Sequence, residues 1–104
     1  MFTIIETPLF TRLISECLSD DEYLNLQLAL VKTPDLGPVI AGTGGVRKVR
    51  WALPGRCKRG GLRVIYYVRS RKGVIWMLTV FPKNVAENIP AHILRAIRQE
   101  IEDE

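Results

Sequence analysis

Apolar positions near the start of the chain predict a short strand followed by an amphipathic helix. Residues 2–6, FTIIE, are rich in β-favouring side chains and suit an edge strand. Thr7 followed by Pro8 is typical of a helix N-terminus, because a threonine hydroxyl accepts from free helix amides and proline fits the first helical position. Apolar residues at helical spacing then extend the expected helix to residue 18.

A second helix is predicted directly after the first. Ser19 and Glu22 form the capping-box pattern, in which each side chain caps the backbone amide of the other residue. Apolar residues continue the helical pattern, which should end near Thr33 because Pro34 follows. The two helices present a large apolar surface, so we expect them to pack against a sheet.

The remaining pattern predicts this sheet and a last helix. Strands are expected at residues 46–53, 62–69 and 74–81, after a loop at 37–45 and with a tight turn at 70–73. Pro82 should end the last strand, and Ile89 and Pro90 should begin the helix. The order βααβββα predicts one α+β domain over residues 1–104. Its two N-terminal helices should pack on one face of a mostly antiparallel four-stranded sheet, with a C-terminal helix after it.

If helices cover one face of the sheet, the opposite face is expected to be open and polar. Side chains two apart on a strand share a face, so Lys48 and Arg50 should point one way while Val49 and Trp51 point toward the helices. Arg63 joins Lys48 and Arg50 if the two strands pair in a suitable register, which the sequence leaves open. We expect Arg63 to be exposed there, so that its removal would leave the fold stable.

The distribution of charge changes this picture of an ordinary polar face. The net charge is +4, but residues 36–86 contain eleven Lys or Arg and no Asp or Glu, whereas both flanking segments are acidic. Ordinary surfaces mix charges of both signs, because mixing limits self-repulsion. A basic block of this length therefore predicts a surface that binds a polyanion.

Composition and termini limit where the protein acts. The chain is 47% hydrophobic and 25% charged, which is typical of a globular domain. No apolar run reaches the roughly 18 residues of a membrane span, and the first ten residues lack the features of a secretory signal. We therefore expect a cytoplasmic protein with no membrane partner. The sequence does not exclude one disulfide between Cys17 and Cys57, although reduced thiols are favoured in that compartment.

Three kinds of site are disfavoured by the residues themselves. Neither glycine cluster, at 42–45 or 60–61, is followed by the Lys-Ser/Thr pair and helix of a nucleotide-phosphate loop, so these glycines are expected to shape turns. Metal-dependent nucleases need clustered carboxylates, which the basic block lacks, so no metal or cofactor is expected. A two-histidine ribonuclease is excluded because His92 is the only histidine, and it is expected on the surface of the last helix.

The chemistry that remains is nucleic-acid binding or cleavage by Lys and Arg. Arginine offers a planar fork of donors to phosphate oxygens, and lysine offers a compact charge. RNA carries its own nucleophile, the 2′-hydroxyl, so clustered cations can assist cleavage without a metal by removing its proton and stabilising charge at phosphorus. From composition alone, binding without cleavage is equally favoured.

Two blocks of the sequence resemble the RelE/HigB superfamily of bacterial type II toxins. The blocks are GGVRKVR at 44–50 and, after a basic loop, GLRVIYY at 61–67, and the resemblance is closest to the HigB-like branch. It extends through LTVF at 78–81 and to Lys83 and Asn84, and it includes the order βααβββα. The resemblance implies an endoribonuclease, or mRNA interferase, that enters the ribosomal A site and inhibits translation. Its products would be a 2′,3′-cyclic phosphate and a 5′-hydroxyl end.

The resemblance also implies partners and site residues. Lys48 and Arg50 match a basic pair expected to serve as base and transition-state stabiliser, Arg63 matches an arginine at the scissile phosphate, and Lys83 falls where the family has a basic residue. Further candidate RNA contacts are Arg47, Lys58, Arg59, Tyr67 and Asn84. The implied partners are the ribosome with its mRNA and a cognate antitoxin, a small helix-turn-helix protein from the same operon, through which operator DNA would be bound.

Some features depart from the family and leave alternatives open. RelE has a tyrosine in its C-terminal segment that stacks on an mRNA base, whereas this chain has no tyrosine after Tyr67. Tyr67 is a weak substitute, and a packing role is favoured for it. The role of general acid or stacking platform is therefore not assigned. A ParE-like toxin that acts on DNA gyrase and a non-catalytic RNA-binding or regulatory module are the alternative functions.

Overall fold

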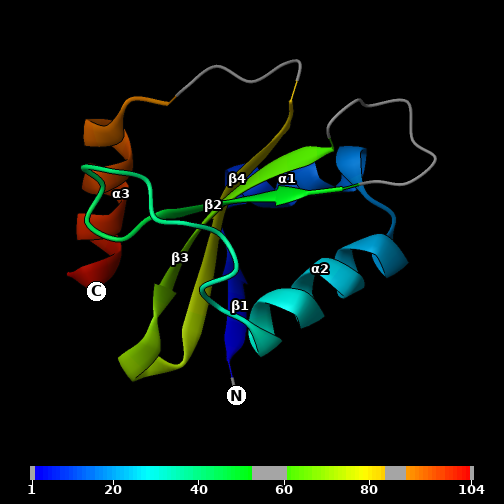
Figure 1. Cartoon of the computed structure of the whole chain (residues 1–104), viewed down its shortest axis with the longest axis horizontal. Helices are drawn as coiled ribbons and strands as arrows, with labels where there is room; N and C mark the ends of the chain where they lie inside the picture. Colours follow the sequence, from blue (N-terminus) through cyan, green and yellow to red (C-terminus); the bar gives the residue numbers. More distant parts are fainter. Residues whose placement is uncertain (1, 53–60, 84–88, 104) are drawn as a thin grey trace.

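A four-stranded sheet separates two N-terminal helices from a C-terminal helix in the computed structural model, which describes residues 2–52, 61–83 and 89–103 (Figure 1). The helices are α1 (Pro8–Cys17), α2 (Asp20–Lys32) and α3 (Ala91–Glu102). The strands are β1 (Thr3–Glu6), β2 (Arg47–Trp51), β3 (Leu62–Arg69) and β4 (Val74–Pro82), with a short 3-10 turn, η1 (Ser70–Lys72), before β4. The predicted order βααβββα is confirmed.

The sheet is mixed, with antiparallel pairs in the majority. Its strand order is β1-β4-β3-β2, in which β1 runs parallel to β4 while the β4–β3 and β3–β2 pairs are antiparallel. The expectation of a mostly antiparallel sheet with the first strand at an edge is therefore confirmed. The strand β2, which carries the candidate cations Lys48 and Arg50, forms the other edge.

Thr7 connects the start of α1 to an irregularity in β4. Its hydroxyl accepts from the Phe10 amide at 3.1 Å, as the cap pattern predicts, and donates to the Leu78 carbonyl at 2.7 Å. Leu78 is the extra residue of a β-bulge, because Ile65 pairs with the residue after it and Tyr66 with the residue before it. A bulge leaves a carbonyl without a ladder partner, and Thr7 satisfies it. The capping box of Ser19 and Glu22 at the start of α2 is also present.

The first core lies between the N-terminal helices and one face of the sheet. Phe10 and Ile14 of α1 and Leu26 and Leu30 of α2 are all buried there. They contact apolar side chains of the three longer strands, namely Val49, Leu62, Val64, Tyr66, Ile75, Met77 and Val80. The prediction that both helices pack on one face is confirmed, and so is the inward orientation of Val49 and Trp51.

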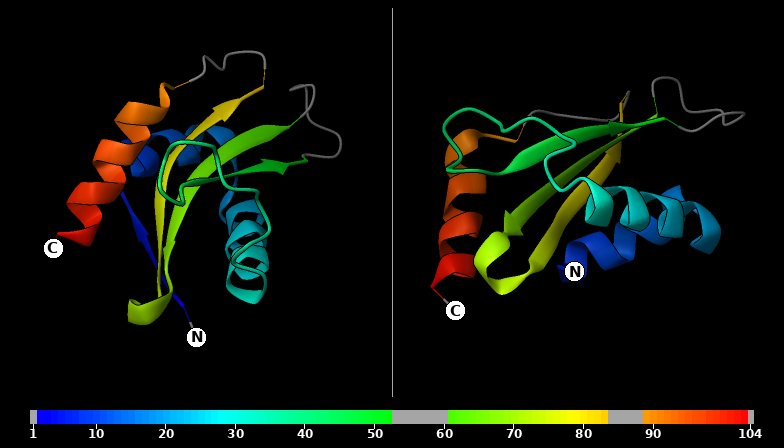
Figure 2. Two further views of the ribbon diagram at one scale, coloured as in Figure 1. Left: turned by 60° about the vertical axis from the view of Figure 1, so that its left-hand side comes forward. Right: turned by 60° about the horizontal axis from the view of Figure 1, so that its bottom comes forward.

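The opposite face is not open, and this part of the prediction is wrong. The helix α3 lies across the sheet from α1 and α2 and packs on this face (Figure 2). Leu94 and Ile101 of α3 join a second core with Val46, Ile65 and Leu78. The sheet therefore has a hydrophobic core on each face. The second core forms because the apolar stripe of α3 is buried against the apolar side chains of this face. Within the described residues, no helix is long and apolar enough to cross a membrane.

The glycine-rich stretch at 42–45 closes this second core. Thr43 is fully buried, and its hydroxyl donates to the Ile40 carbonyl at 2.7 Å and accepts from the Val46 amide at 3.0 Å. Gly45 has a φ of +116°, and a Cβ there would approach the Tyr67 ring to 3.3 Å. The interpretation of these glycines as turn and close-approach positions is confirmed.

Candidate nucleic-acid interface

Strand register brings three cations onto the face that also carries α3. Arg50 of β2 lies directly opposite Arg63 of β3, and Lys48 lies opposite Ile65. Directly opposed residues in an antiparallel pair have Cα atoms about 4.5–5.5 Å apart and project to the same side. Lys48, Arg50 and Arg63, called the basic cluster below, therefore share one face at the end of the sheet that leads into residue 52.

The burial of Arg63 corrects the expectation that it is exposed. Its side chain is 9% exposed, whereas Arg50 is exposed and Lys48 is half-buried. The difference follows from position, because β3 is an inner strand and Arg63 lies between Arg50 on one side and Phe81 on the other. Replacing Arg63 would therefore perturb packing as well as charge, so we now expect its removal to destabilise the fold.

Lys83 lies just beyond β4 at the same end of the sheet. Its amide donates to the Gly61 carbonyl at 3.2 Å, which continues the β3–β4 ladder past Pro82, and the residue is exposed. This position places Lys83 near the strand ends that carry Arg50 and Arg63. Lys58, Arg59 and Asn84, three further candidate RNA contacts, lie outside the described residues, as does Cys57.

Arg47 lies on the other face of β2 and has a structural contact. Its guanidinium Nη1 donates to the Gly37 carbonyl at 2.8 Å. Its cross-strand partner Tyr66 is fully buried and accepts from the Gly37 amide at 2.9 Å while donating to the Pro34 carbonyl at 2.8 Å. Arg47 and Tyr66 thus hold the connection between α2 and β2, and the structure does not bring Arg47 together with the basic cluster.

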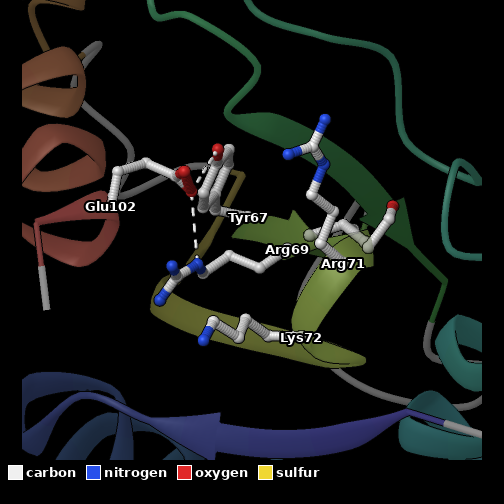
Figure 3. Close-up of a pocket in the computed structure, with 7 residues that line it drawn as sticks. Tyr67, Arg69, Arg71, Lys72 and Glu102 are labelled. Atoms are coloured by element: carbon white, nitrogen blue, oxygen red, sulfur yellow. Dashed lines mark hydrogen bonds and ion pairs between the residues drawn. The ribbon is translucent and has the colours of Figure 1, made fainter.

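Tyr67 shares the face of the basic cluster but is tied to the C-terminal helix. Its hydroxyl donates to Glu102 Oε2 at 2.9 Å, and the same oxygen lies 3.3 Å from Arg69 Nε (Figure 3). Arg69 also donates to the Ile101 carbonyl at 3.1 Å, at the C-terminal end of α3. Burial, followed by the bond to Glu102, raises the pKa of the Tyr67 phenol. These contacts give Tyr67 the packing role that the sequence favours.

An apolar hollow beside Lys48 was not anticipated from the sequence. It has a volume of about 160 Å³ and is lined, apart from Lys48, by Ile40, Ile65, Phe81, Ile89, Ala91 and Leu94. We call it the inner hollow. Its lining, with Lys48 included, comes from five separate parts of the chain, so no local motif signals it. Phe81 is the last aromatic residue of the Phe, Tyr and Trp type in the sequence, and it lies opposite Arg63.

A second, wider hollow follows the outer edge of β2. This edge hollow has a volume of about 650 Å³ and is lined by backbone and side chains of Leu36, Pro38 and residues 48–52. The Lys48 amide there donates to the Pro38 carbonyl at 3.1 Å, so residues 38–40 cover only the first part of the edge. Lys48 borders both hollows.

His92 is exposed in the first turn of α3, as expected.

Comparison with solved structures identifies the architecture. The chain matches the E. coli toxin RelE, solved as a mutant in the free state, with a TM-score of 0.57 and 16% sequence identity. The match covers 93% of this chain and 96% of that one. The chain has a RelE-like fold. No protein-family model matches the sequence. At this identity the RelE-like similarity establishes the fold, and the activity has to be argued from the site.

Proposed function

We propose that the protein is the toxin of a type II toxin-antitoxin system and acts as a ribosome-dependent mRNA endonuclease of the HigB-like branch. The observation that carries the proposal is the direct opposition of Arg50 and Arg63 beside Lys48, within a RelE-like fold. Side chains at directly opposed positions project to the same side, and each arginine offers a planar fork of donors suited to the oxygens of one RNA phosphate. The two sequence blocks that resemble the HigB-like branch contain all three residues.

The proposed reaction uses the 2′-hydroxyl of the RNA as the nucleophile. The 2′-oxygen attacks the adjacent phosphorus, its proton passes to a base, and the 5′-oxygen leaves after it is protonated. The products are a 2′,3′-cyclic phosphate and a 5′-hydroxyl, so no water is consumed. Arg63 and Arg50 would stabilise the extra negative charge at phosphorus, since positioned cations act most strongly where charge develops. Lys48 and Lys83 remain the candidates for proton transfer.

The proposed partners follow from the same function. The ribosome would present mRNA to the basic cluster, and a small antitoxin from the same operon would neutralise the toxin and bind operator DNA in the complex. Such an antitoxin is expected to contribute an acidic segment, because residues 36–86 carry eleven positive side chains and no negative ones.

The decisive experiment is brief induction of the protein followed by mapping of mRNA 5′ ends. We expect new 5′-hydroxyl ends within translated reading frames and inhibited growth. Intact transcripts with halted replication would refute the nuclease proposal and favour the ParE-like alternative. Intact transcripts with normal growth but retained RNA binding would favour the non-catalytic module.

Variants locate the activity within the molecule. Arg50→Ala should abolish the new mRNA ends, because it removes a charge that would stabilise the phosphorus centre. Arg50 is exposed, so the substitution removes little packing and should leave the protein folded. Arg71→Ala is the matched control, since Arg71 is an exposed arginine of η1 at the opposite end of β3. Equal loss of cleavage in both variants would contradict a site at the basic cluster. A 2′-deoxy nucleotide 5′ of the cut should block cleavage.

A further inference from the structure

The inner hollow lies directly beside the basic cluster. Lys48 is part of its wall, and Ile65, the residue opposite Lys48, is another part. Phe81 lies across the ladder from Arg63. The hollow therefore includes Lys48 in its wall, and its Phe81 lies directly opposite Arg63 on the same face of the sheet.

Its size and lining suit a single planar ring system. Except for Lys48 the lining side chains are apolar, and the volume of about 160 Å³ is well below the roughly 300–1,000 Å³ of sites for drug-sized ligands. A phenylalanine ring offers a stacking surface to any base, since every base has a π-face. An apolar pocket beside clustered cations matches a nucleotide, which combines a flat, weakly polar base with an anionic phosphate.

The first turn of α3 adds to this match. Ala91, its first residue, lines the hollow, and Pro90 caps the helix without a side-chain hydrogen bond. A helix N-terminus carries partial positive charge and favours a nearby anion. The positive end of α3 and the basic cluster thus flank the same hollow.

We propose that the inner hollow binds one nucleobase of single-stranded RNA, with its ring against Phe81 and its phosphate at the basic cluster. This inference rests on the proposed function and adds a base-binding residue to it. Stacking on a phenylalanine is tolerant of base identity, so Phe81 contributes affinity and positions the phosphate. Any preference among bases would come from the shape of the surrounding isoleucines.

The test is a titration of the whole protein, labelled at isoleucine methyl groups, with adenosine 5′-monophosphate and with ribose 5-phosphate. The nucleotide should shift the methyl resonances of Ile40, Ile65 and Ile89, which line the hollow, and leave Ile75 in the other core unchanged. Ribose 5-phosphate, which lacks the base, should leave the hollow methyls nearly unshifted.

Two variants separate the base from the phosphate. Phe81→Leu should weaken nucleotide binding about tenfold, equivalent to about 1.4 kcal/mol, while binding of ribose 5-phosphate stays the same. Trp51→Leu is the matched aromatic control, because Trp51 lines the edge hollow and packs on the opposite core. It should leave nucleotide binding unchanged. The Ile75 methyl resonance reports whether each variant is folded.

Several results would overturn the proposal. Equal shifts from both ligands would place only a phosphate there, and weaker binding in Trp51→Leu alone would move the base to the edge hollow. Shifts caused by an acidic phenylalanine-containing peptide but by no mononucleotide would make the hollow a protein-binding site. Cleavage of mRNA without base binding would refute this inference and leave the proposed function standing. Binding of the base without cleavage of mRNA would refute the proposed function and leave this inference standing.

Discussion

Tyr66→Phe is predicted to lower the free energy of unfolding, because it removes one buried hydroxyl group. Tyr66 is fully buried, and its hydroxyl accepts from the Gly37 amide at 2.9 Å and donates to the Pro34 carbonyl at 2.8 Å. Phenylalanine keeps the ring and its packing in the first core. The substitution therefore isolates the two hydrogen bonds that hold the connection between α2 and β2.

The size of the effect follows from the burial of Gly37. This residue is buried, and the Tyr66 hydroxyl is the acceptor for its amide, so the variant leaves a buried donor unsatisfied at a cost of about 1–3 kcal/mol. We expect the free energy of unfolding to fall by about 2 kcal/mol. For a domain of about 100 residues, 1 kcal/mol corresponds to roughly 5 °C, so Tm should fall by about 10 °C.

Urea unfolding, thermal unfolding and amide hydrogen exchange measure the effect together. The Gly37 amide should be protected in the original protein and exchange rapidly in the variant. Tyr67→Phe is the matched control, because its hydroxyl donates to Glu102, whose side chain is 34% exposed, and water can replace that bond. The control should lose less than about 1 kcal/mol. Equal losses in the two variants, or a protected Gly37 amide in Tyr66→Phe, would refute the reasoning.

Further predictions concern the C-terminal helix, the tyrosines and the helix cap. Glu102→Gln should weaken the attachment of α3 to β3 and increase hydrogen exchange in α3, because it removes the charge that pairs with Arg69; unchanged exchange would contradict this. The pKa values of all three tyrosines are raised above 10.0, chiefly by burial. Their contribution to stability should therefore persist below pH 10 and decrease as pH rises further. A near-ultraviolet titration in which any tyrosine of the folded protein ionises below pH 10 would contradict this prediction. Ser19→Ala should cost about 1 kcal/mol through loss of the capping box, and urea unfolding with no measurable change would count against that role.

The sequence alone determines the elements of this fold and the side to which most residues of each strand point. Thr7 and Ser19 mark helix starts by accepting hydrogen bonds from amides three residues away. Alternation along residues 47–51 separates Lys48 and Arg50 from Val49 and Trp51. These signals are local, since helix caps and strand alternation depend on neighbours within a few residues. They were sufficient to predict βααβββα and the first core.

Only the tertiary structure decides how these elements meet. The opposition of Arg50 and Arg63 depends on strand register, and the burial of Arg63 depends on β3 being an inner strand. The packing of α3 on the second face and the hollow that includes Phe81 combine residues from positions 40 to 101. No short sequence pattern connects these residues. Such contacts form because each apolar surface must be buried against another. Which two surfaces pack together depends on the fold of the whole chain.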